Sequence, residues 1–528
     1  MCHTPTLWRC LGGLIASLFI AGSAHALSVN DAKNMATGES DERVAAIAAA
    51  QADAETVAFL KALLQDAVKV KGDRVWVMQG DQGVDPVSGQ ASAMPQDAED
   101  VVNNNRLRGE IESTLAGFDL LSPDLALRRR ALLTMQTQVD INKLPLLEKA
   151  LAAETDATLR AQITLLRAAA LLTSEVTAQR LQAAKNLADS GQANTKTLLL
   201  ERLKSETEPE VKAALGAALR QVESALAWGD KLGAIFSGIS LGSILLLVAL
   251  GLAITYGLMG VINMAHGELM MIGAYATYVV QGLFQKFLPG AFDWYLLAAV
   301  PVAFLASALM GAALERGVIR FLYGRPLETL LATWGISLML MQLVRSVFGA
   351  QNVGVENPVW MSGGVQVLGN LSLPFNRLVI IGFAIFVLGS VAWMIGKTRL
   401  GLFVRGVTQN RPIASCMGVN TARIDTYAFA LGSGIAGLAG CALSQVGNVG
   451  PDLGQGYIVD AFMVVVLGGV GQLAGTVYAA LGLGILNKFL EGWAGAVLAK
   501  IAVLVFIIIF IQKRPQGIFA MRGRSAEA

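Results

Sequence analysis

Residues 231–528 contain a series of apolar stretches, most of them long enough to cross a lipid bilayer as a helix, and this feature constrains the fold most strongly. A spanning helix needs about 20 mostly apolar residues, and inside lipid its backbone groups must be satisfied within the segment. Hydrophobic residues form 54% of the 528 residues, which favours a lipid-embedded bundle over several soluble domains. We therefore expect an all-α, polytopic transmembrane helical bundle. Its clear apolar runs are Ile235–Met259, Leu269–Phe284, Tyr295–Leu314, Leu330–Phe348, Leu378–Ile395, Tyr427–Leu443, Phe462–Leu481 and Val497–Ile511.

Positive charge predicts the orientation of these spans, because cytoplasmic loops carry an excess of Lys and Arg. The loops 350–376 and 446–456 contain neither residue and should be periplasmic. An exported N-terminus and a cytoplasmic C-terminus require an odd number of crossings. We therefore divide the Gly-rich region 459–493 into two spans and expect about nine. The basic segments carry Arg316, Arg320 and Arg325; Lys397, Arg399, Arg405, Arg411 and Arg423; and Lys513, Arg514, Arg522 and Arg524.

The N-terminus has the pattern of a secretory signal peptide over residues 1–26. Arg9 precedes an apolar run from Leu11 to Ile20, and Ala24-His25-Ala26 is a small-x-small cleavage site. An uncleaved membrane anchor is the alternative, although the apolar core is shorter than a spanning helix needs. Both interpretations place residues 27–230 in the periplasm of a bacterium whose inner membrane holds the bundle.

Residues 27–230 form a separate region of different composition. They contain 29 acidic and 22 basic side chains, whereas residues 231–528 contain 10 and 18. Helical periodicity, as in Leu159, Ile163 and Leu166, predicts a soluble α-helical domain. A repeat at an offset of 52, in which Leu146–Ala161 resembles Leu198–Ala213, suggests stacked helix pairs of a HEAT-like solenoid, with a generic helical bundle as the alternative.

One short part of this region is predicted to form β structure. Val68–Val77 alternates apolar and polar residues on both sides of Gly72-Asp73, which predicts a small hairpin. The stretch 79–100 has loop composition. The two cysteines expected to survive processing, Cys416 and Cys441, lie in the membrane region, so a disulfide framework is not expected.

The chain lacks the common signatures of catalysis and nucleotide binding. No phosphate-binding Gly-x-x-x-x-Gly-Lys-Ser/Thr, His-Glu-x-x-His or Cys-x-x-Cys motif occurs. The carboxylates of residues 27–230 are spread along helix faces and do not have metal-ligand spacing. We therefore expect no enzymatic activity, no bound metal or cofactor and no nucleic-acid partner, and ATP, if it is used, on another subunit.

Glycine is abundant in the membrane region, as in 431–440 and 467–475. Small residues allow helix backbones to approach closely. The alternative for Gly468–Gly475 is a broken or re-entrant segment that lines a polar path.

The most distinct group of polar residues among the apolar runs follows the first span, in Gly260–Glu268. Asn263, His266 and Glu268 stand there directly before an apolar run. Ionisable residues within a membrane are expensive and often line a solute path. A helix cap or a position at the cytoplasmic interface would explain them equally.

A second motif is the basic loop from Lys397 to Gly418, which reads as a short surface helix bounded by glycines. Its apolar residues Leu402, Phe403, Val407 and Ile413 alternate with arginines. Such a helix can lie on anionic membrane lipid or dock into another protein, and its spacing alone favours neither.

Four motifs together resemble the LivH-type permeases of branched-chain amino acid ABC importers. They are Tyr256-Gly-Leu-Met-Gly-Val-Ile-Asn-Met-Ala-His-Gly-Glu268, the 399–418 loop, Val466-Leu-Gly-Gly-Val-Gly-Gln-Leu-Ala-Gly-Thr476 and Arg514-Pro-Gln-Gly-Ile-Phe519. The resemblance covers nearly all of 231–520. Within that family, the long exported extension and the motifs around Asn263 and Gln409 resemble the urea-transporting permease subunits.

The resemblance implies a permease that moves a small polar solute, most specifically urea, by alternating access. It implies a second permease subunit, cytoplasmic ATPases and a periplasmic solute-binding protein as partners. It also implies that the 399–418 loop is the coupling helix, with Arg399, Gly401, Arg405, Gln409, Asn410 and Gly418 as its candidate residues.

Polarity within the expected spans selects the residues of a solute path, because a neutral solute such as urea needs hydrogen-bond donors and acceptors. A branched-chain amino acid permease is the alternative function. A membrane receptor or anchor whose exported domain binds a ligand or partner, and a channel or secondary carrier, are alternatives of other classes. The path candidates are Thr255, Asn263, His266, Glu268, Tyr275, Thr333 and Gln472.

Overall fold

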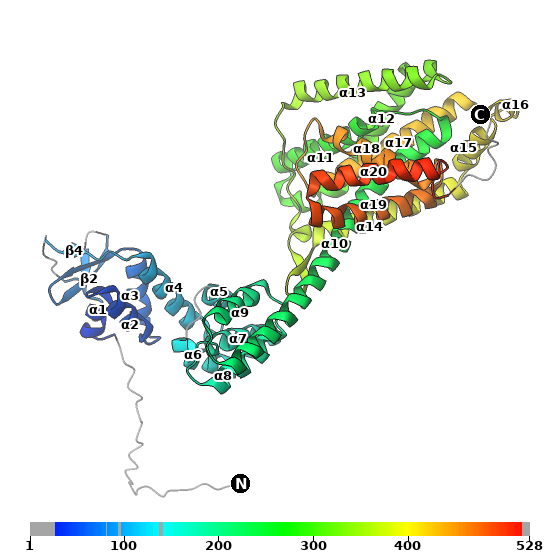
Figure 1. Ribbon diagram of the computed structural model, residues 1–528. Helices are drawn as coiled ribbons and strands as arrows, with labels where there is room; N and C mark the ends of the chain where they lie inside the picture. The colour runs from blue at the N-terminus through cyan, green and yellow to red at the C-terminus, as the bar shows by residue number, and fades with distance from the viewer. Residues whose placement is uncertain (1–26, 81, 93–94, 96, 137–140, 520–528) are drawn as a thin grey trace, which may run out of the picture. The chain divides into compact units, whose positions relative to one another are not determined.

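A computed structural model describes residues 27–519 of the protein, apart from 81, 93–94, 96 and 137–140 (Figure 1). The signal peptide expected at 1–26 therefore lies outside the described residues. The chain divides into two compact units. The first runs to Ser190 and includes Asn194–Val222, and the second comprises Gly191–Ala193 and the residues from Glu223 onward. The division falls within helix α10 (Pro209–Met259), close to the expected domain boundary at residue 230 but not at a helix end.

The first unit begins with helices that pack around a small antiparallel sheet. Their buried side chains, among them Ile47, Phe59 and Ile111, form one core. The strands follow the order β3-β2-β1-β4. The elements are α1 (Val29–Ala36), α2 (Ser40–Ala48), α3 (Ala54–Leu64), β1 (Val68–Lys71), β2 (Arg74–Gln79), β3 (Gln82–Val84), β4 (Glu99–Asp100) and α4 (Asn105–Asp119).

The predicted hairpin is confirmed. Val68 pairs with Val77 and Lys71 with Arg74, which leaves Gly72-Asp73 as a two-residue turn with a positive φ of 57° at Gly72. The interpretation of 79–100 as loop alone is wrong, because β3 and β4 lie within it. These strands have two or three residues and little apolar alternation, so their pairing with β2 and β1 has no sequence signal.

The remainder of the first unit is a helical repeat. Its helices are α5 (Leu125–Met135), α6 (Leu144–Ala153), α7 (Ala157–Leu171), α8 (Thr177–Ala188) and α9 (Ala193–Ser205), with the short helix η1 (Ile141–Lys143) before α6. Helices α4, α7 and α10 start 52 residues apart, and so do α5 and α8. The offset seen in the sequence therefore spans three helices, not the expected pair. The assignment to HEAT-like solenoids stays a prediction.

A buried ion pair recurs in this repeat. The Glu154 carboxylate, in the turn between α6 and α7, accepts a hydrogen bond from Arg128 Nε (2.9 Å) and from the backbone N–H groups of Thr155 and Asp156. Burial alone would raise the pKa of Glu154, but these hydrogen bonds and the Arg128 charge outweigh burial and lower the pKa.

The equivalent pair lies 52 residues later. Glu206 lies 3.1 Å from Arg180 Nε and accepts from the backbone N–H groups of Thr207 and Glu208, and its pKa is likewise lowered against the effect of burial. Each arginine also donates to two carbonyls before its own helix, as Arg180 does to Ser174 and Glu175. The pairs therefore fix the turns between successive helices.

We expect Glu154→Gln to destabilise the first unit by about 3 kcal/mol, because it leaves the largely buried Arg128 charge without its counter-ion. The control is Glu148→Gln. Glu148 is half-exposed in its ion pair with Arg167, so the loss should be smaller than about 1 kcal/mol. Amide hydrogen exchange of α5–α7 in the purified full chain measures both. Because the folded pKa is lowered, this stabilisation is present above the unfolded pKa and is lost as the pH falls through the folded pKa. Equal exchange in the two variants would contradict this role.

The second unit contains the apolar helices. Seven helices within the described residues are long and apolar enough to cross a membrane: α10, α12 (Tyr295–Gly317), α13 (Pro326–Phe348), α14 (Phe375–Lys397), α17 (Thr421–Ser444), α19 (Leu473–Ala494) and α20 (Ala496–Lys513). Two further helices lie in the second unit, and the expected count of about nine spans stays a prediction. They are α11 (His266–Phe287), which begins with buried polar residues, and α18 (Leu453–Gly468), which has only 16 residues.

The Gly-rich region 459–493 is divided into two helices, as expected from parity. Positive φ angles at Gly469 (98°) and Gly471 (78°) form the turn between α18 and α19. A Cβ on Gly468 would lie 2.5 Å from the backbone carbon of Gly475, so the two helices meet backbone to backbone. Ile518 N–H donates to the carbonyl of Leu467 (2.8 Å), so the C-terminal segment covers this turn. Close packing therefore accounts for the glycines here.

The centre of the bundle consists of α11, α12 and α17, which pack through small residues. A Cβ on Gly273 of α11 would lie 2.2 Å from the carbonyl oxygen of Gly437 in α17. A Cβ on Gly440 would lie 1.9 Å from the carbonyl oxygen of Met270. Ser307 of α12 donates to the carbonyl of Leu269 (2.8 Å). Only small residues permit these approaches.

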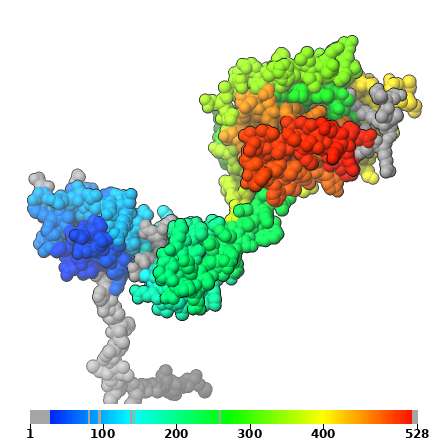
Figure 2. Space-filling view, in the orientation of Figure 1, coloured from blue at the N-terminus to red at the C-terminus, as the bar shows by residue number. Residues whose placement is uncertain are grey.

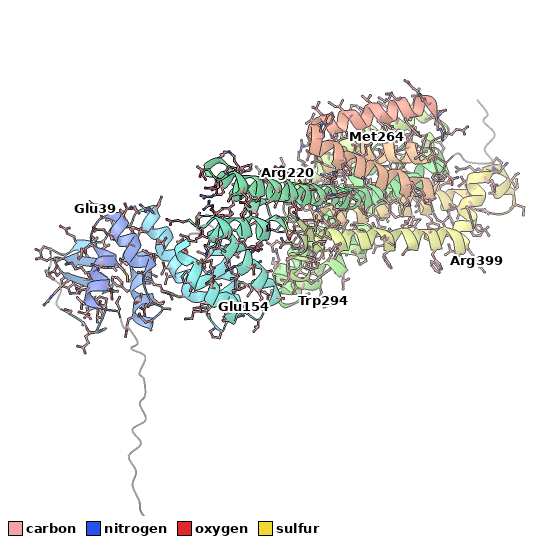
Figure 3. All side chains as sticks on the ribbon, turned by 60° about the horizontal axis from the view of Figure 1, so that its bottom comes forward. Glu39, Glu154, Arg220, Met264, Trp294 and Arg399 are labelled. Atoms are coloured by element: carbon pink, nitrogen blue, oxygen red, sulfur yellow. The ribbon has the colours of Figure 1, made fainter. Side chains whose placement is uncertain are left out.

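The bundle has two chemically different ends, and Figure 3 places Arg399 at one and Trp294 at the other. The basic end carries the short helices η3 (Ile319–Leu322), α15 (Arg399–Gln409) and α16 (Arg411–Cys416), and there the Arg411 guanidinium lies 5.0 Å from the centre of the Tyr323 ring. The opposite end carries η2 (Pro289–Trp294), η4 (Val359–Met361) and the hairpin of β5 (Gly364–Leu368) and β6 (Leu371–Pro374). The Arg-free loops also meet there, through the bridge between Val353 and Val449.

We expect Gly273→Ala to disrupt the bundle, because its methyl group would overlap the Gly437 carbonyl and force α11 and α17 apart. Overpacking of this kind costs about 1–3 kcal/mol. Gly282→Ala in the same helix is the control, since nothing lies within 4 Å of its Cβ and helix propensity improves by up to about 1 kcal/mol. The unfolding temperature of the purified chain in detergent distinguishes the two. An equally stable Gly273→Ala variant would show that α11 and α17 do not depend on this contact.

Candidate functional site

The turn between α10 and α11 brings the polar residues of Gly260–Glu268 into the bundle. Gly260, with a φ of 64°, ends α10 and redirects the chain. Asn263 is buried, and its side-chain oxygen accepts from the backbone N–H of Ala265 (3.1 Å). Its amide nitrogen has no hydrogen-bond partner. Asn263 therefore satisfies the start of α11 and leaves a buried donor unused.

His266 is fully buried against α10. Its Nε2 lies 3.1 Å from the carbonyl oxygen of Val248, and because a carbonyl only accepts, Nε2 carries the proton. The ring touches Gly251, where a Cβ would lie 3.0 Å from Cε1. Nδ1 has no partner. His266 therefore holds α11 to α10.

Glu268 points to the other side of α11. Residues two apart on a helix differ in direction by about 200°, and the Glu268 carboxylate lies near Ser337 of α13. Its side chain is buried, with 2% exposed, and Oε2 has no partner. His266 and Glu268 therefore do not form one site, although they are adjacent in the sequence.

Three other path candidates are buried in the bundle. Thr255 donates to the carbonyl of Leu252 in its own helix (3.1 Å), which explains it without a solute. Thr333 of α13 accepts from the backbone N–H of Met264 (3.2 Å), so it joins α13 to the α10–α11 turn. The Tyr275 ring lies 4.6 Å from that of Phe348, and its hydroxyl has no partner.

Gln472 lies in the turn between α18 and α19. It is half-buried at the N-cap position of α19, in the glycine turn at the basic end, and its side chain does not cap the helix. Its backbone carbonyl accepts from Thr476. The structure therefore places Gln472 at the end of the bundle and not in its interior.

Sequence reasoning missed most of the polar face of α13. Thr329 and Ser337 are as buried as Thr333, and the three recur at a spacing of four residues along the inward face. A helical plot of Pro326–Phe348 contains this signal. Ser433 of α17, also buried and without a hydrogen-bond partner, was missed as well.

The basic loop forms two helices, not the single one expected. Thr398 caps α15 by accepting from the N–H of Gly401, and Asn410 caps α16 by accepting from the N–H of Ile413 (3.1 Å). Gly401 lies against the end of α14, where a Cβ would overlap the Ile395 carbonyl. Gly418 (φ 85°) ends the motif. The break at Asn410 arises because Pro412 occupies the first turn of α16.

The outer face of this helix pair is apolar and basic. Leu402, Phe403, Ile413 and Met417 are exposed, with 60%, 40%, 61% and 79% of their surfaces accessible. Arg399, Arg405 and Gln409 are also exposed. Val407, expected on the same surface, is buried instead against Val404 and Ala428. We call Leu402, Phe403, Ile413, Met417 and Arg405 the coupling surface.

An ion-pair network connects α16 to the bundle. The Arg411 guanidinium hydrogen-bonds the buried Asp425 carboxylate of α17. Beside it, Glu315 of α12 accepts from Arg320, from the Tyr323 hydroxyl (3.0 Å) and from Thr426 (2.6 Å). Burial and the carboxylates of Asp425 and Glu315 raise the pKa of Tyr323, which keeps this donor protonated. The sequence signal was the presence of two acidic residues near the ends of apolar spans.

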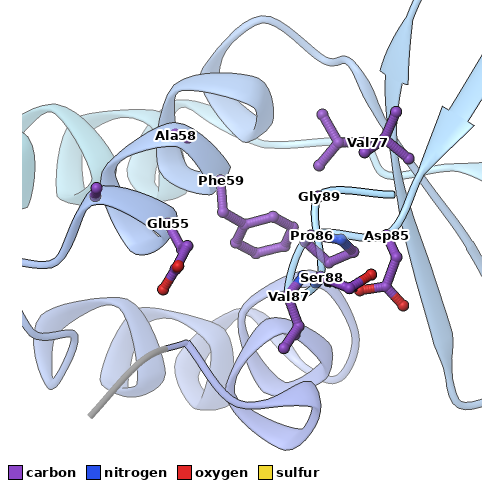
Figure 4. Close-up of a pocket in the computed structure, with 11 residues that line it drawn as sticks. Glu55, Ala58, Phe59, Val77, Asp85, Pro86, Val87, Ser88 and Gly89 are labelled. Carbon is purple, nitrogen blue, oxygen red and sulfur yellow. Dashed lines mark hydrogen bonds between the residues drawn. The ribbon is translucent and has the colours of Figure 1, made fainter. Parts of the chain in front are cut away.

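Other hollows of the chain do not resemble catalytic sites. Figure 4 shows a pocket of about 340 Å³ in the first unit, where the Phe59 ring points at Pro86. Its Asp85 carboxylate is occupied by the N–H groups of Val87 and Ser88. A polar pocket of about 360 Å³ lies at the opposite end of the bundle, between Asp230, Asn370 and Arg377. In the described part of the chain, no three His, Cys, Asp or Glu side chains are grouped to hold a metal.

Comparison with known proteins assigns the second unit. Residues 234–512 match the family model described as "Branched-chain amino acid transport system / permease component". The high-affinity branched-chain amino acid transport system permease protein LivH of Escherichia coli is 28% identical over 292 residues, which cover 54% of this chain and 93% of that protein. BraD of Pseudomonas aeruginosa, with the same description, is 26% identical over 288 residues, or 53% and 93% of the two chains.

A more distant relative is named as a sugar permease. The ribose import permease protein RbsC of Escherichia coli is 30% identical over 206 residues, which cover 37% of this chain and 61% of that protein. No solved structure shows a significant match to the chain. The relatives are transport permeases, and their matches leave about half of this chain uncovered.

We expect Asp425→Asn to loosen α16 from the bundle, because the Arg411 charge loses its buried counter-ion. Amide exchange in 411–418 should rise at least tenfold, which corresponds to about 1.4 kcal/mol. The control is Glu328→Asn, which removes the exposed pair with Arg325 at the same end. Unchanged exchange in Asp425→Asn would show that apolar packing alone holds α16.

Proposed function

The chain belongs to the branched-chain amino acid transport permease family, and from this we propose that it is the membrane-spanning permease subunit of an ATP-driven importer for a small polar solute. The second unit would form the transport domain in a bacterial inner membrane. The basic end would face the cytoplasm, because it holds the Arg-rich segments, and the C-terminus would lie there too. The first unit and the opposite end would then be periplasmic.

The coupling surface is the observation that supports this proposal most directly. Exposed leucine, phenylalanine, isoleucine and methionine side chains on two short capped helices, beside arginines, fit a groove in a protein. A helix pair that only rested on lipid would not need the Arg411–Asp425 link to the centre of the bundle. We infer that a cytoplasmic ATPase docks on this surface.

The remaining partners follow from the family. A second permease subunit would complete the transport domain, and a periplasmic solute-binding protein would deliver the solute to the opposite end. ATP would bind to the ATPase subunits, and this chain would hold no cofactor. Closure of the ATPases would move α15 and α16, and the ion-pair network would transmit this movement to α12 and α17. The bundle would then alternate between outward-open and inward-open states.

Branched-chain amino acids are the first candidate solute, because the relatives LivH and BraD are named as permeases for them. Urea is the second candidate. The observation that favours urea is the long helical region 27–230. It lies outside residues 234–512, which match the family model, and it resembles the extension of urea-transporting permeases. A receptor or anchor function is less favoured, since LivH and BraD are named as permeases.

The decisive experiment compares uptake of labelled leucine and labelled urea by cells that carry the intact chain with its native partner subunits. We expect ATP-dependent uptake, and Arg405→Glu should lower it at least tenfold because the reversed charge opposes docking of the ATPase. Arg345→Glu is the control: it makes the same charge change at an exposed position near the other end of α13.

The outcomes separate the candidates. Leucine uptake alone assigns the amino acid function, and urea uptake alone assigns the urea function. Uptake that Arg405→Glu leaves intact would contradict the coupling surface. Uptake of neither solute would favour the receptor or anchor interpretation.

A further inference from the structure

We propose that the pocket between α10, β6 and α14 binds a membrane phospholipid whose headgroup carries both a phosphate and an ammonium group. This inference requires only that the second unit is embedded in a membrane, and it does not depend on which solute the bundle transports. It follows from a cavity that contains charges of both signs, at the level where two helices pass from charged to apolar sequence.

The pocket, of about 360 Å³, is formed where the hairpin of β5 and β6 packs on α10. Figures 1 and 2 show this hairpin, in yellow-green, against α10. Its tip fits there because Gly229 has no side chain: a Cβ would lie 1.9 Å from the side-chain oxygen of Asn370. The Asn370 amide donates to the carbonyl of Leu226 (2.9 Å) and to the Asp230 carboxylate (2.8 Å). The hairpin therefore forms a fixed wall of the pocket.

The pocket is lined by one basic and one acidic side chain. Arg377, half-buried in the first turn of α14, has no ion-pair partner among the described residues. Asp230 is exposed and accepts a hydrogen bond from the neutral Asn370 amide. Ser237 and Ser372 add hydroxyl groups to the lining. The planar guanidinium of an arginine matches the oxygens of a phosphate, and a carboxylate accepts from an ammonium group. The pocket is therefore complementary to a group that carries both charges.

The position of the pocket along its helices corresponds to the surface of the membrane. Asp230 and Lys231 are the last charged residues of α10, and Arg377 is the only charged residue of α14 before Lys397 at its end. Trp228 is 61% exposed, with the Lys231 ammonium 5.1 Å from its ring centre. Tryptophan is enriched where a membrane protein meets the lipid headgroups, and lysine side chains reach that level from helix ends. The pocket therefore lies at the level of the headgroups.

Exposed apolar side chains next to the pocket favour a lipid over a soluble phosphorylated amine. Four of them adjoin a lining residue in the chain and are 37–42% exposed: Leu232 and Ile235 of α10, and Phe375 and Leu378 of α14. The acyl chains of a lipid would cover such side chains, whereas a soluble molecule would fill the pocket alone. The arrangement therefore provides for both the charged headgroup and the apolar chains of a phospholipid.

The test incubates the purified full chain in detergent with equal amounts of phosphatidylethanolamine and phosphatidylglycerol and measures the retained lipid by native mass spectrometry. We expect the intact chain to retain at least threefold more phosphatidylethanolamine, because the glycerol headgroup has no ammonium group. Arg377→Gln should lower the retention of both lipids at least fivefold. Arg377→Lys keeps the charge without the planar fork, so its retention should be intermediate. The control is Arg345→Gln, which removes an exposed arginine near the same end but outside the pocket.

Asp230→Asn tests the contact with the ammonium group. Asparagine keeps an oxygen that can accept from Asn370, so the hairpin stays in place while the negative charge is removed. We expect the preference for phosphatidylethanolamine over phosphatidylglycerol to disappear in this variant. Glu356→Gln, which removes an exposed acid at the same end, should leave the preference unchanged. Unfolding temperatures equal to that of the intact chain verify that the variants are folded.

Soluble phosphoethanolamine, which has the same headgroup without acyl chains, distinguishes a lipid from a soluble ligand. We expect that a large excess of it does not displace the retained phosphatidylethanolamine. Displacement would overturn the lipid assignment and indicate a soluble ligand instead. Equal retention of the two lipids by the intact chain would overturn the assignment of the headgroup. Retention by Arg377→Gln that matches Arg345→Gln would overturn the pocket as the binding site.

Discussion

The second unit depends on backbone contact between α11 and α17. In lipid, the hydrophobic effect does not drive helices together, so packing must come from close van der Waals contact and hydrogen bonds. Gly273, Gly437 and Gly440 allow that contact, since any larger residue would overlap a carbonyl. Ser307 adds a hydrogen bond from α12 to Leu269 in the same region. These contacts fix the direction in which each side chain of α11 points.

The position of α11 explains why neighbouring polar residues have different roles. One face meets α10 and α17, where His266 donates to the Val248 carbonyl and holds two helices together. The other face meets α13, where Glu268 finds only Ser337. The same helix therefore uses one buried polar side chain to join two helices and leaves another with an unpaired oxygen.

The sequence allowed the fold class to be predicted, since length and apolarity determine where helices cross a membrane. The alternation around Gly72-Asp73 also located the hairpin turn. The requirement for an odd number of crossings indicated the division of the region 459–493. It could not show that His266 and Glu268 diverge, because both simply interrupt an apolar run. The pairs Glu315–Thr426 and Arg411–Asp425 join different helices, and no local pattern records such contacts. Val407 was misplaced because α15 ends at Gln409, which limits the pattern to three turns.

The repeat in the first unit also shows what could not be predicted from the sequence. An offset of 52 was visible in the sequence, but the number of helices within it was not, because amphipathic Ala/Leu helices align in any register. The structure identifies the repeated feature as an arginine at the start of one helix and a glutamate before another, 26 residues later. The apolar positions that drew attention to the repeat are common to most helices and are therefore less informative than the ion pair.

Two buried acids of the second unit, Glu315 and Glu268, lead to the final argument. Both are inaccessible to solvent, and both would be costly in a membrane without partners. Glu315 receives hydrogen bonds from Arg320, Tyr323 and Thr426, so it is fully accounted for as a structural link at the basic end. Glu268 has one neutral partner and an unpaired oxygen. Glu315 therefore links separate segments at the basic end, whereas Glu268 adds no comparable link to the bundle.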